Sequence, residues 1–138
     1  MADTFQLEVA TPERLFVDEQ VSEAEVPGKE GYLGILPGHA PLLSALAPGV
    51  LTYRGGSGEH VLAVDGGFVE VLDNHVRVLA DHAERAQDVK RDAAQRQLEE
   101  ASGRLREAKD EAESNAALLE MQKAQARLDA SGRGGHAA

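Results

Sequence analysis

The residues of this chain that could perform acid–base or metal chemistry are five histidines and 24 carboxylates. Metal sites need ligands at short, regular spacings, such as the two histidines of HExxH on one helix face. No such spacing occurs among the histidines, which are His39, His60, His75, His82 and His136. The carboxylates are scattered along the chain, which is typical of a solvated surface rather than of a catalytic pair. The sequence therefore predicts no metal site and no acid–base centre.

The glycine-rich stretch RGGSGEH, residues 54–60, is the other candidate for chemistry. A phosphate-binding loop needs GxxxxGK[ST] and a hydrolase elbow needs GxSxG, but here no lysine follows and Glu59 replaces the last glycine. The stretch lies between two apolar runs, so we interpret it as the turn of a β-hairpin. The chain has no cysteine, which excludes thiolate ligands and disulfides. We expect no catalytic site, and we expect that the protein is not an enzyme.

The most unusual stretch is GYLGILPGHAPLLSALAPG, residues 31–49. No charged residue occurs from Gly31 to Tyr53, although 28% of the chain is charged. Its prolines cannot donate hydrogen bonds to a sheet, so they belong to edges and loops. Two buried strands would explain part of the segment but leave few places to bury Leu36, Leu42 and Leu43. An apolar surface beside prolines and one imidazole, that of His39, is typical of a protein contact.

Short strands must position this segment. FQLEV alternates apolar and polar residues, and further apolar runs recur at short intervals up to HVRVLA. Between them stand residues typical of turns: Pro27-Gly28, Gly55-Gly56-Ser57-Gly58, Asp65-Gly66-Gly67 and Asp73-Asn74. The pattern predicts an all-β sandwich.

The last fifty residues have a helical pattern. Two apolar stripes repeat at steps of three and four: Leu98, Ala101, Leu105, Ala108 and Ala112, then Ala117, Met121, Ala124 and Leu128. The stripes are out of phase by roughly 140°, so we predict two helices with a turn near Glu107–Glu111. Asp110 would cap the second helix, with Glu113 reaching back in a capping box. We expect the tail to fray from about residue 131. Because both stripes are rich in alanine, the helices should bury little surface.

The charge distribution supports two units, residues 1–87 and 88–138. The first has a net charge of −9 and the second of −1. The total of −10 argues against nucleic acid as a partner. No apolar run is long enough to span a bilayer and no secretory signal is visible, so we expect no direct membrane insertion.

The segments EGYLGILPGHAPLLSALAPGVL and VDGGFVEVLDNHVRVLAD, in this order, resemble the epsilon subunit of F-type ATP synthase. The resemblance implies a sandwich of about ten strands followed by a C-terminal helical hairpin. It implies a non-catalytic rotor subunit of the central stalk of a proton-translocating enzyme, bound to the gamma subunit and to the ring of c subunits. It further implies a peripheral position on the cytoplasmic face of the bacterial plasma membrane, or on the stromal face of a thylakoid.

The resemblance also assigns residues to these partners. The expected interface comprises Tyr32, Pro37, Gly38, His39, Ala40, Pro41, Leu42 and Leu43. Tyr32 stands where some relatives carry an acidic residue that faces the c-ring. The helices of relatives can extend into the catalytic head, where they inhibit ATP hydrolysis near the alpha and beta subunits. The matching basic residues are Arg104, Arg106, Lys123 and Arg127.

Some relatives bind ATP through an Ile/Leu-Asp-x-x-Arg-Ala motif at the start of the first helix. Here the acidic position is Lys90, the arginine position is Ala93, and a further basic position is Glu100. Glu84, Lys123 and Arg127 do match positions that contribute in those relatives. We therefore expect no cofactor. The alternative to the epsilon interpretation is a free-standing binding module whose helices self-associate as a coiled coil.

Overall fold

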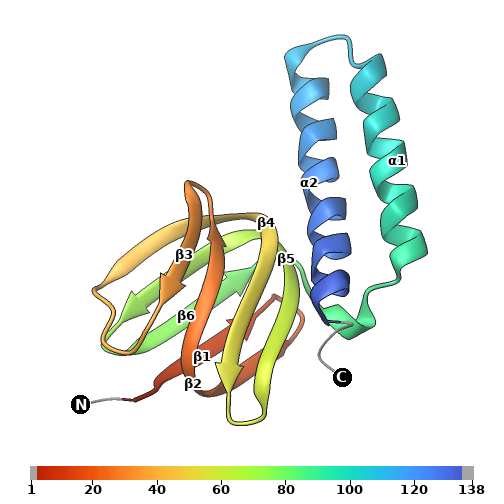
Figure 1. Ribbon diagram of the computed structural model, residues 1–138. Coiled ribbons are helices and arrows are strands. Elements are labelled where there is room, and N and C mark those ends of the chain that lie inside the picture. Colours follow the sequence, from red (N-terminus) through yellow and green to blue (C-terminus); the bar gives the residue numbers. More distant parts are fainter. Residues whose placement is uncertain (1–2, 135–138) are drawn as a thin grey trace.

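The computed structural model describes residues 3–134, which form a β-sandwich and a helical hairpin (Figure 1). The strands are β1 (Phe5–Ala10), β2 (Leu15–Gly28), β3 (Gly31–Ile35), β4 (Leu42–Gly55), β5 (Gly58–Leu72), β6 (His75–Ala80) and β7 (Ala83–Arg85). A short 3₁₀ helix, η1 (Ala86–Asp88), leads into α1 (Arg91–Glu107) and α2 (Glu111–Gly134). The predicted fold class, a sandwich followed by two helices, is confirmed.

Five strands form a closed ring in the order β1-β6-β5-β4-β2, because β2 also pairs with β1. β3 extends the sheet beyond β2, and β7 pairs with β5. All strand pairs are antiparallel except β1–β6, which is parallel. Alternate residues of these strands point inward and fill the core with Val, Leu, Ile and Phe side chains, among them Phe5, Leu7, Val69 and Val71.

The expectation of about ten strands was wrong for the described residues, which contain seven. The predicted turn at Asp65-Gly66-Gly67 lies inside β5, where the two glycines have φ angles of +121° and +111°. A Cβ on Gly67 would stand 2.0 Å from the carbonyl oxygen of Leu79. The glycines therefore bend β5 beside β6 without ending it. β2 likewise continues through two register shifts, between Val21 and Glu23 and between Glu25 and Gly28.

Two of the predicted turns are tight hairpins. Gly56 and Ser57 join β4 to β5, and Asp73 and Asn74 join β5 to β6. Asp73 and Asn74 have φ angles of 51° and 60°, as a two-residue turn of the type I′ class requires. These turns fix the register of β5 against its neighbours on both sides.

The hairpin turns at residues 108–110, as predicted. The Asp110 carboxylate accepts a hydrogen bond from the Glu113 backbone N–H at 2.8 Å. The Glu113 carboxylate accepts from the Lys109 N–H at 3.1 Å, one residue before the expected partner. The second stripe faces α1, with Ala117, Ala124 and Leu128 buried. In the first stripe Ala101 is buried, but Ala112 is exposed because α2 begins just before it.

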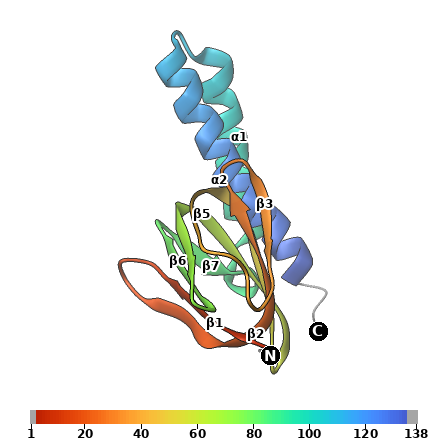
Figure 2. The same ribbon diagram turned by 90° about the vertical axis from the view of Figure 1, so that its left-hand side faces the viewer.

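α2 lies between the sandwich and α1, and the loop end of the hairpin projects beyond the strands (Figures 1 and 2). The expected fraying from residue 131 was wrong as far as Gly134, because α2 continues to that residue. Ala130 of α2 is buried on the sandwich together with Val50, Val61, Ala63 and Ala86. Residues 135–138, including His136, lie outside the described part of the chain.

Candidate functional site

The loop between β3 and β4 is anchored at its glycine. Gly38 has a φ angle of +82° and its N–H donates to the Asn74 side-chain oxygen at 2.8 Å. The Asn74 amide nitrogen donates in turn to the Thr4 carbonyl at 2.8 Å. The His39 N–H closes the turn by donating to the Leu36 carbonyl at 3.1 Å. One side chain, that of Asn74, therefore ties the predicted interface loop to the first strand and to the β5–β6 turn.

The imidazole of His39 is half-buried and bonded locally. Its Nδ1 lies 2.7 Å from the Ala40 carbonyl oxygen, so Nδ1 donates and Nε2 is left to accept. The neighbouring Leu36 and Leu43 are 60% and 72% exposed. Leu42 is the inward residue of the segment and packs against the core. The uncharged segment therefore divides between core and surface, with Ile35 and Leu46 in the core and Leu36 and Leu43 on the surface.

A row of apolar side chains crosses five strands of the sandwich. The strand registers align Ala45 of β4, Phe68 of β5, Leu79 of β6, Ala10 of β1 and Leu15 of β2. Residues paired across strands share a face, so these five form one line, which we name the apolar row. Phe68, Leu79 and Leu15 are 57%, 53% and 54% exposed. Large apolar residues gathered in this way mark a surface that contacts another protein.

Polar and charged residues next to the apolar row pair with one another. The Glu8 carboxylate pairs with His75 Nε2 at 2.8 Å and with Arg77 Nε at 3.5 Å. Arg77 also reaches Glu70 at 4.0 Å. The apolar row therefore has a polar border of paired side chains. An apolar centre with a polar rim is the usual composition of a protein interface.

Sequence reasoning missed the apolar row, although one signal was present. In FVEVL, Phe68 and Glu70 are two positions apart and so lie on the same face of the strand. The charge of Glu70 indicates that this face is exposed to solvent. Leu79 carried the same signal, because it lies two positions after Arg77 in HVRVLA, whereas Leu15 did not. The register that aligns Leu79 with Leu15 is set by the parallel pairing of β1 with β6.

Tyr32 has a structural contact as well as an exposed ring. Its hydroxyl accepts a hydrogen bond from the Val50 N–H at 3.0 Å, while its side chain is 53% exposed. The β2–β4 ladder is irregular between Glu25 and Gly28, and Tyr32 lies close over Gly49, where a Cβ would be 2.8 Å from its hydroxyl. Tyr32 therefore stabilises the β4 backbone and leaves one ring face free.

The four basic helix residues do not form one patch. Arg104 and Arg106 are exposed in the last turn of α1, near the loop of the hairpin. Lys123 pairs with Glu120 at 3.5 Å on the same helix. Arg127 lies beside the sandwich, where its Nε donates to Glu84 at 2.6 Å and its Nη1 donates to Gln97 at 3.0 Å. The first two residues are free for a partner, whereas Arg127 is engaged within the chain.

The positions of the ATP motif line two separate hollows. Lys90 and Ala93 border one at the start of α1, with Arg91, Asp92 and Arg96. Glu84, Lys123 and Arg127 border another, of about 270 Å³, between the sandwich and both helices. Asp65 lines this second hollow, and burial raises the pKa of its carboxyl, opposed by the nearby charges of His82 and Lys123. Glu100 is exposed on α1.

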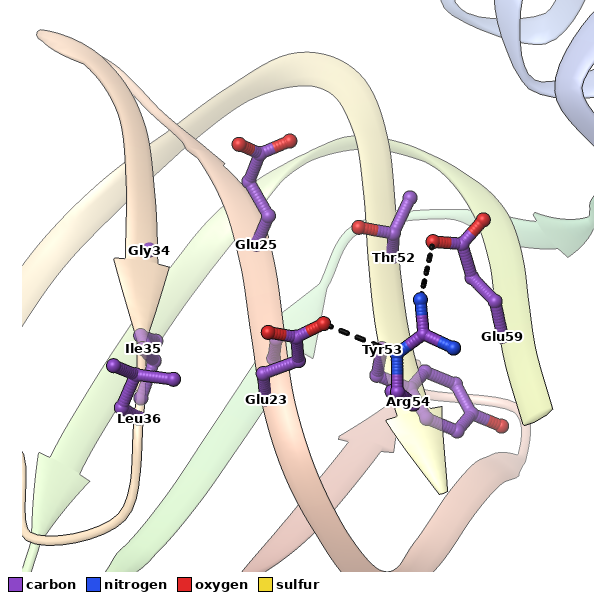
Figure 3. A pocket seen from close by; sticks show the side chains of 10 residues that line it. Glu23, Glu25, Gly34, Ile35, Leu36, Thr52, Tyr53, Arg54 and Glu59 are labelled. Carbon is purple, nitrogen blue, oxygen red and sulfur yellow. Dashed lines mark hydrogen bonds and ion pairs between the residues drawn. The ribbon is translucent and has the colours of Figure 1, made fainter. Parts of the chain in front are cut away.

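A third hollow, of about 410 Å³, opens on strands β2 to β5 (Figure 3). Arg54 stands between Glu23, at 3.2 Å, and Glu59, at 3.7 Å, and all three side chains are about half exposed. Solvated ion pairs of this kind contribute little and perform no chemistry. Among the described residues no group of three His, Asp or Glu side chains could hold a metal ion. None of the helices in residues 3–134 is long and apolar enough to cross a membrane.

Comparison with known proteins agrees with this arrangement. Residues 4–86 match the family model of the ATP synthase delta/epsilon chain, β-sandwich domain. The chain is 58% identical over 99 residues to the ATP synthase epsilon chain of Solibacter usitatus, covering 72% of this chain and 74% of that one. It is 43% identical over 128 residues to the epsilon chain of Nitratidesulfovibrio vulgaris, covering 93% and 96%.

Solved structures show the same fold. A chain of the Euglena gracilis mitochondrial ATP synthase, OSCP/F1/c-ring, superposes with a TM-score of 0.82 at 23% identity, covering 95% of this chain and 82% of that one. A chain of the Tetrahymena thermophila ATP synthase central stalk/c-ring gives 0.69 at 21% identity, covering 91% and 95%. The fold and its surface define a non-catalytic subunit of a larger complex. The chain belongs to the family of ATP synthase epsilon chains.

Proposed function

We propose that this chain is a rotor subunit of the central stalk in a proton-translocating F-type ATP synthase, where it binds the gamma subunit and rests on the c-ring. The observation that carries the proposal is the exposed apolar row, together with the anchored 37–43 loop, on a chain of this family. We assign the apolar row and residues Pro37 to Leu43 to gamma. The turn that leads into Tyr32 is assigned to the c-ring.

Membrane association follows from membership of an ATP synthase, whose c-ring is named in the two solved relatives. We propose the finer location as the cytoplasmic face of the bacterial plasma membrane, or the stromal face of the thylakoid for a plastid protein. The chain itself would reach the membrane only through its partners.

The helical hairpin is proposed to restrain ATP hydrolysis by extending toward the alpha and beta subunits. Arg104 and Arg106, exposed near the hairpin loop, would then lie near acidic residues of beta. The test is a chain ending at Gln87, assembled with the other subunits of the complex. It should still bind gamma and support synthesis, and ATP hydrolysis by the complex should rise. Hydrolysis equal to that of the complex with the full chain would reject the inhibitory role.

We also propose that the chain binds no ATP. Arg127, one of the matching cations, is already bonded to Glu84 and Gln97, and the motif positions Lys90 and Ala93 line another hollow. Each missing charge-assisted hydrogen bond removes roughly 1.5–3 kcal/mol, so two losses weaken binding about a hundredfold or more. Titration calorimetry of the isolated chain should show no saturable binding below the millimolar range.

No structural observation favours the alternative, a binding module that self-associates through its helices. Ala117, Ala124 and Leu128 of the proposed coiled-coil stripe are buried inside one chain's hairpin. Sedimentation analysis of the isolated chain should therefore give a monomer. A stable dimer that dissociates on substitution of Leu98 or Leu128 would support the alternative instead.

A further inference from the structure

The contact between the hairpin and the sandwich has a small apolar part. The buried cluster that joins them has one helix residue, Ala130, packed against Val50, Val61, Ala63 and Ala86. An alanine side chain removes little apolar area from water, about one methyl group's worth. Apolar packing of this size does not by itself fix a helix pair against a sheet.

The same contact has one polar link. Among the described residues, the pair Glu84–Arg127 is the one side-chain hydrogen bond or ion pair that joins a strand to a helix. Arg127 Nε lies 2.6 Å from Glu84 Oε1, and the two side chains are 26% and 30% exposed. Arg127 precedes Ala130 by three residues, so both lie on the face of α2 that meets the sandwich. Glu84 is paired in β7 with Ala63, a member of the apolar cluster.

The hairpin is joined to itself more firmly than to the sandwich. Arg91 of α1 donates to the Leu128 carbonyl at 3.2 Å and to the Ser131 hydroxyl. Gln97 donates to Glu120 at 3.2 Å and accepts from Arg127 at 3.0 Å. These bonds connect α1 to α2 near the end of the hairpin that touches the sandwich. If the link to Glu84 is broken, the two helices are expected to move as one body.

We propose that Glu84–Arg127 is a latch that sets the equilibrium between a hairpin docked on the sandwich and a hairpin released from it. Gln97 holds the guanidinium in the orientation that meets Glu84, so the latch closes without a search over arginine rotamers. Because the apolar contact is small, a change at this one pair shifts the populations. For the assembled complex, the inference rests on the proposed function of the hairpin.

The test measures docking in the isolated chain by thiol labelling. Ala63 is 5% exposed and lies under α2, and the chain has no cysteine of its own. In an Ala63→Cys background, the labelling rate at limiting reagent reports the fraction of released hairpin. Arg127→Gln should raise this rate about tenfold, a value reduced from that of a fully buried charge pair because both side chains are partly exposed. A rate equal to that of the Ala63→Cys parent would overturn the proposal.

Matched variants separate the latch from general effects. Arg106→Gln makes the same exchange at an exposed position near the loop of the hairpin and should leave the rate unchanged. The double exchange Glu84→Arg with Arg127→Glu should restore most of the protection. An equal rise for Arg106→Gln, or no recovery in the double exchange, would show that the pair has no specific role.

A second thiol distinguishes release of the hairpin from unfolding. Val69 lies in the sandwich core and is 0% exposed, so the thiol of a Val69→Cys chain reacts only when the sandwich opens. Arg127→Gln should leave that rate unchanged, and an equal increase at both thiols would mean a loss of global stability. The experiment uses no other subunit. Its result therefore stands even if the assembled complex shows no inhibition by the hairpin.

Discussion

The bend at Gly66-Gly67 divides β5 into one half that the chain itself covers and one half that is exposed. Before the bend, Val61 and Ala63 are small and are covered by the chain's own α2. After the bend, Phe68 is large and 57% exposed, in line with Leu79. A helix binds weakly to a surface of small side chains, whereas large exposed apolar side chains are typical of a surface that contacts another protein. The first surface suits a reversible contact and the second a lasting one.

The largest effect is expected from a substitution that disrupts the contact between α2 and the covered half of β5. Ala130→Glu would place a charge against Val50 and Val61, and the cation on the same face of α2, Arg127, is already bonded to Glu84. A buried unpaired charge costs about 3 kcal/mol or more, so the hairpin should be released and labelling of an Ala63→Cys thiol should rise at least about a hundredfold. Gln125→Glu adds the same charge on the exposed side of α2 and should change the rate little. Equal rates for both variants would mean that Ala130 does not hold the hairpin.

A substitution in the uncovered half of β5 should weaken binding to gamma and change the stability of the free chain little. Phe68→Ser removes the central side chain of the apolar row, and loss of an interface anchor typically costs about 2 kcal/mol, or roughly thirtyfold in affinity for gamma. Because Phe68 is exposed in the free chain, unfolding free energy should change by less than about 0.5 kcal/mol. Leu118→Ser, at a 43% exposed position of the hairpin, is the control that should leave gamma binding intact. Surface plasmon resonance with a gamma-containing complex measures the affinity of both variants.

His39→Ala tests the 37–43 loop, the other part of the surface assigned to gamma. The imidazole bonds only to the neighbouring Ala40 carbonyl among its described side-chain contacts, so the free chain should keep its melting temperature. Loss of one hydrogen bond across the interface would weaken gamma binding by about 0.5–1.5 kcal/mol, a few-fold to tenfold. A large fall in melting temperature with unchanged affinity would place His39 in the support of the fold instead.

The smallest effect is expected at Asp65, next to the covered half. Burial raises the pKa of this carboxyl, so the folded state binds its proton more tightly than the unfolded state. The contribution of Asp65 to stability is therefore best below its unfolded pKa of about 3.9, and it is lost as pH rises through the raised folded value. Asp65→Asn removes this loss. In urea titrations, the stability of the variant relative to the parent should rise from pH 3.5 to pH 7; a difference that does not change with pH would contradict this expectation.

Local patterns predicted most of the fold. The alternation in FQLEV, the turn at Asp73-Asn74 and the cap at Asp110 were all visible in the sequence, because each depends on neighbours in the chain. The bend at Gly66-Gly67 was not, since a glycine pair also suits a turn. What decides between them is the backbone of β6, thirteen residues or so away along the chain, which leaves no room for a side chain on Gly67.

The candidate site was predictable in part. The 37–43 segment stood out by its lack of charge, and the structure anchors it at the surface. The apolar row could not be predicted, because its members come from five strands and only the register aligns them. The docking face of α2 was missed for a similar reason. Ala126 and Ala130 lie off the stripe that faces α1, and the sequence alone does not show which neighbour a buried alanine contacts.

The parallel pairing of β1 with β6 imposes an order on synthesis. The first strand leaves the ribosome early, but the partner that closes the ring ends only at Ala80. At about 5–20 residues per second, Phe5 waits roughly 4 to 15 s before that partner exists. During this interval one edge of β1 is open to other nascent chains, and chaperones that bind extended segments have time to reach it. For this subunit, the moment of greatest exposure to misassembly therefore comes before the strand ring can close.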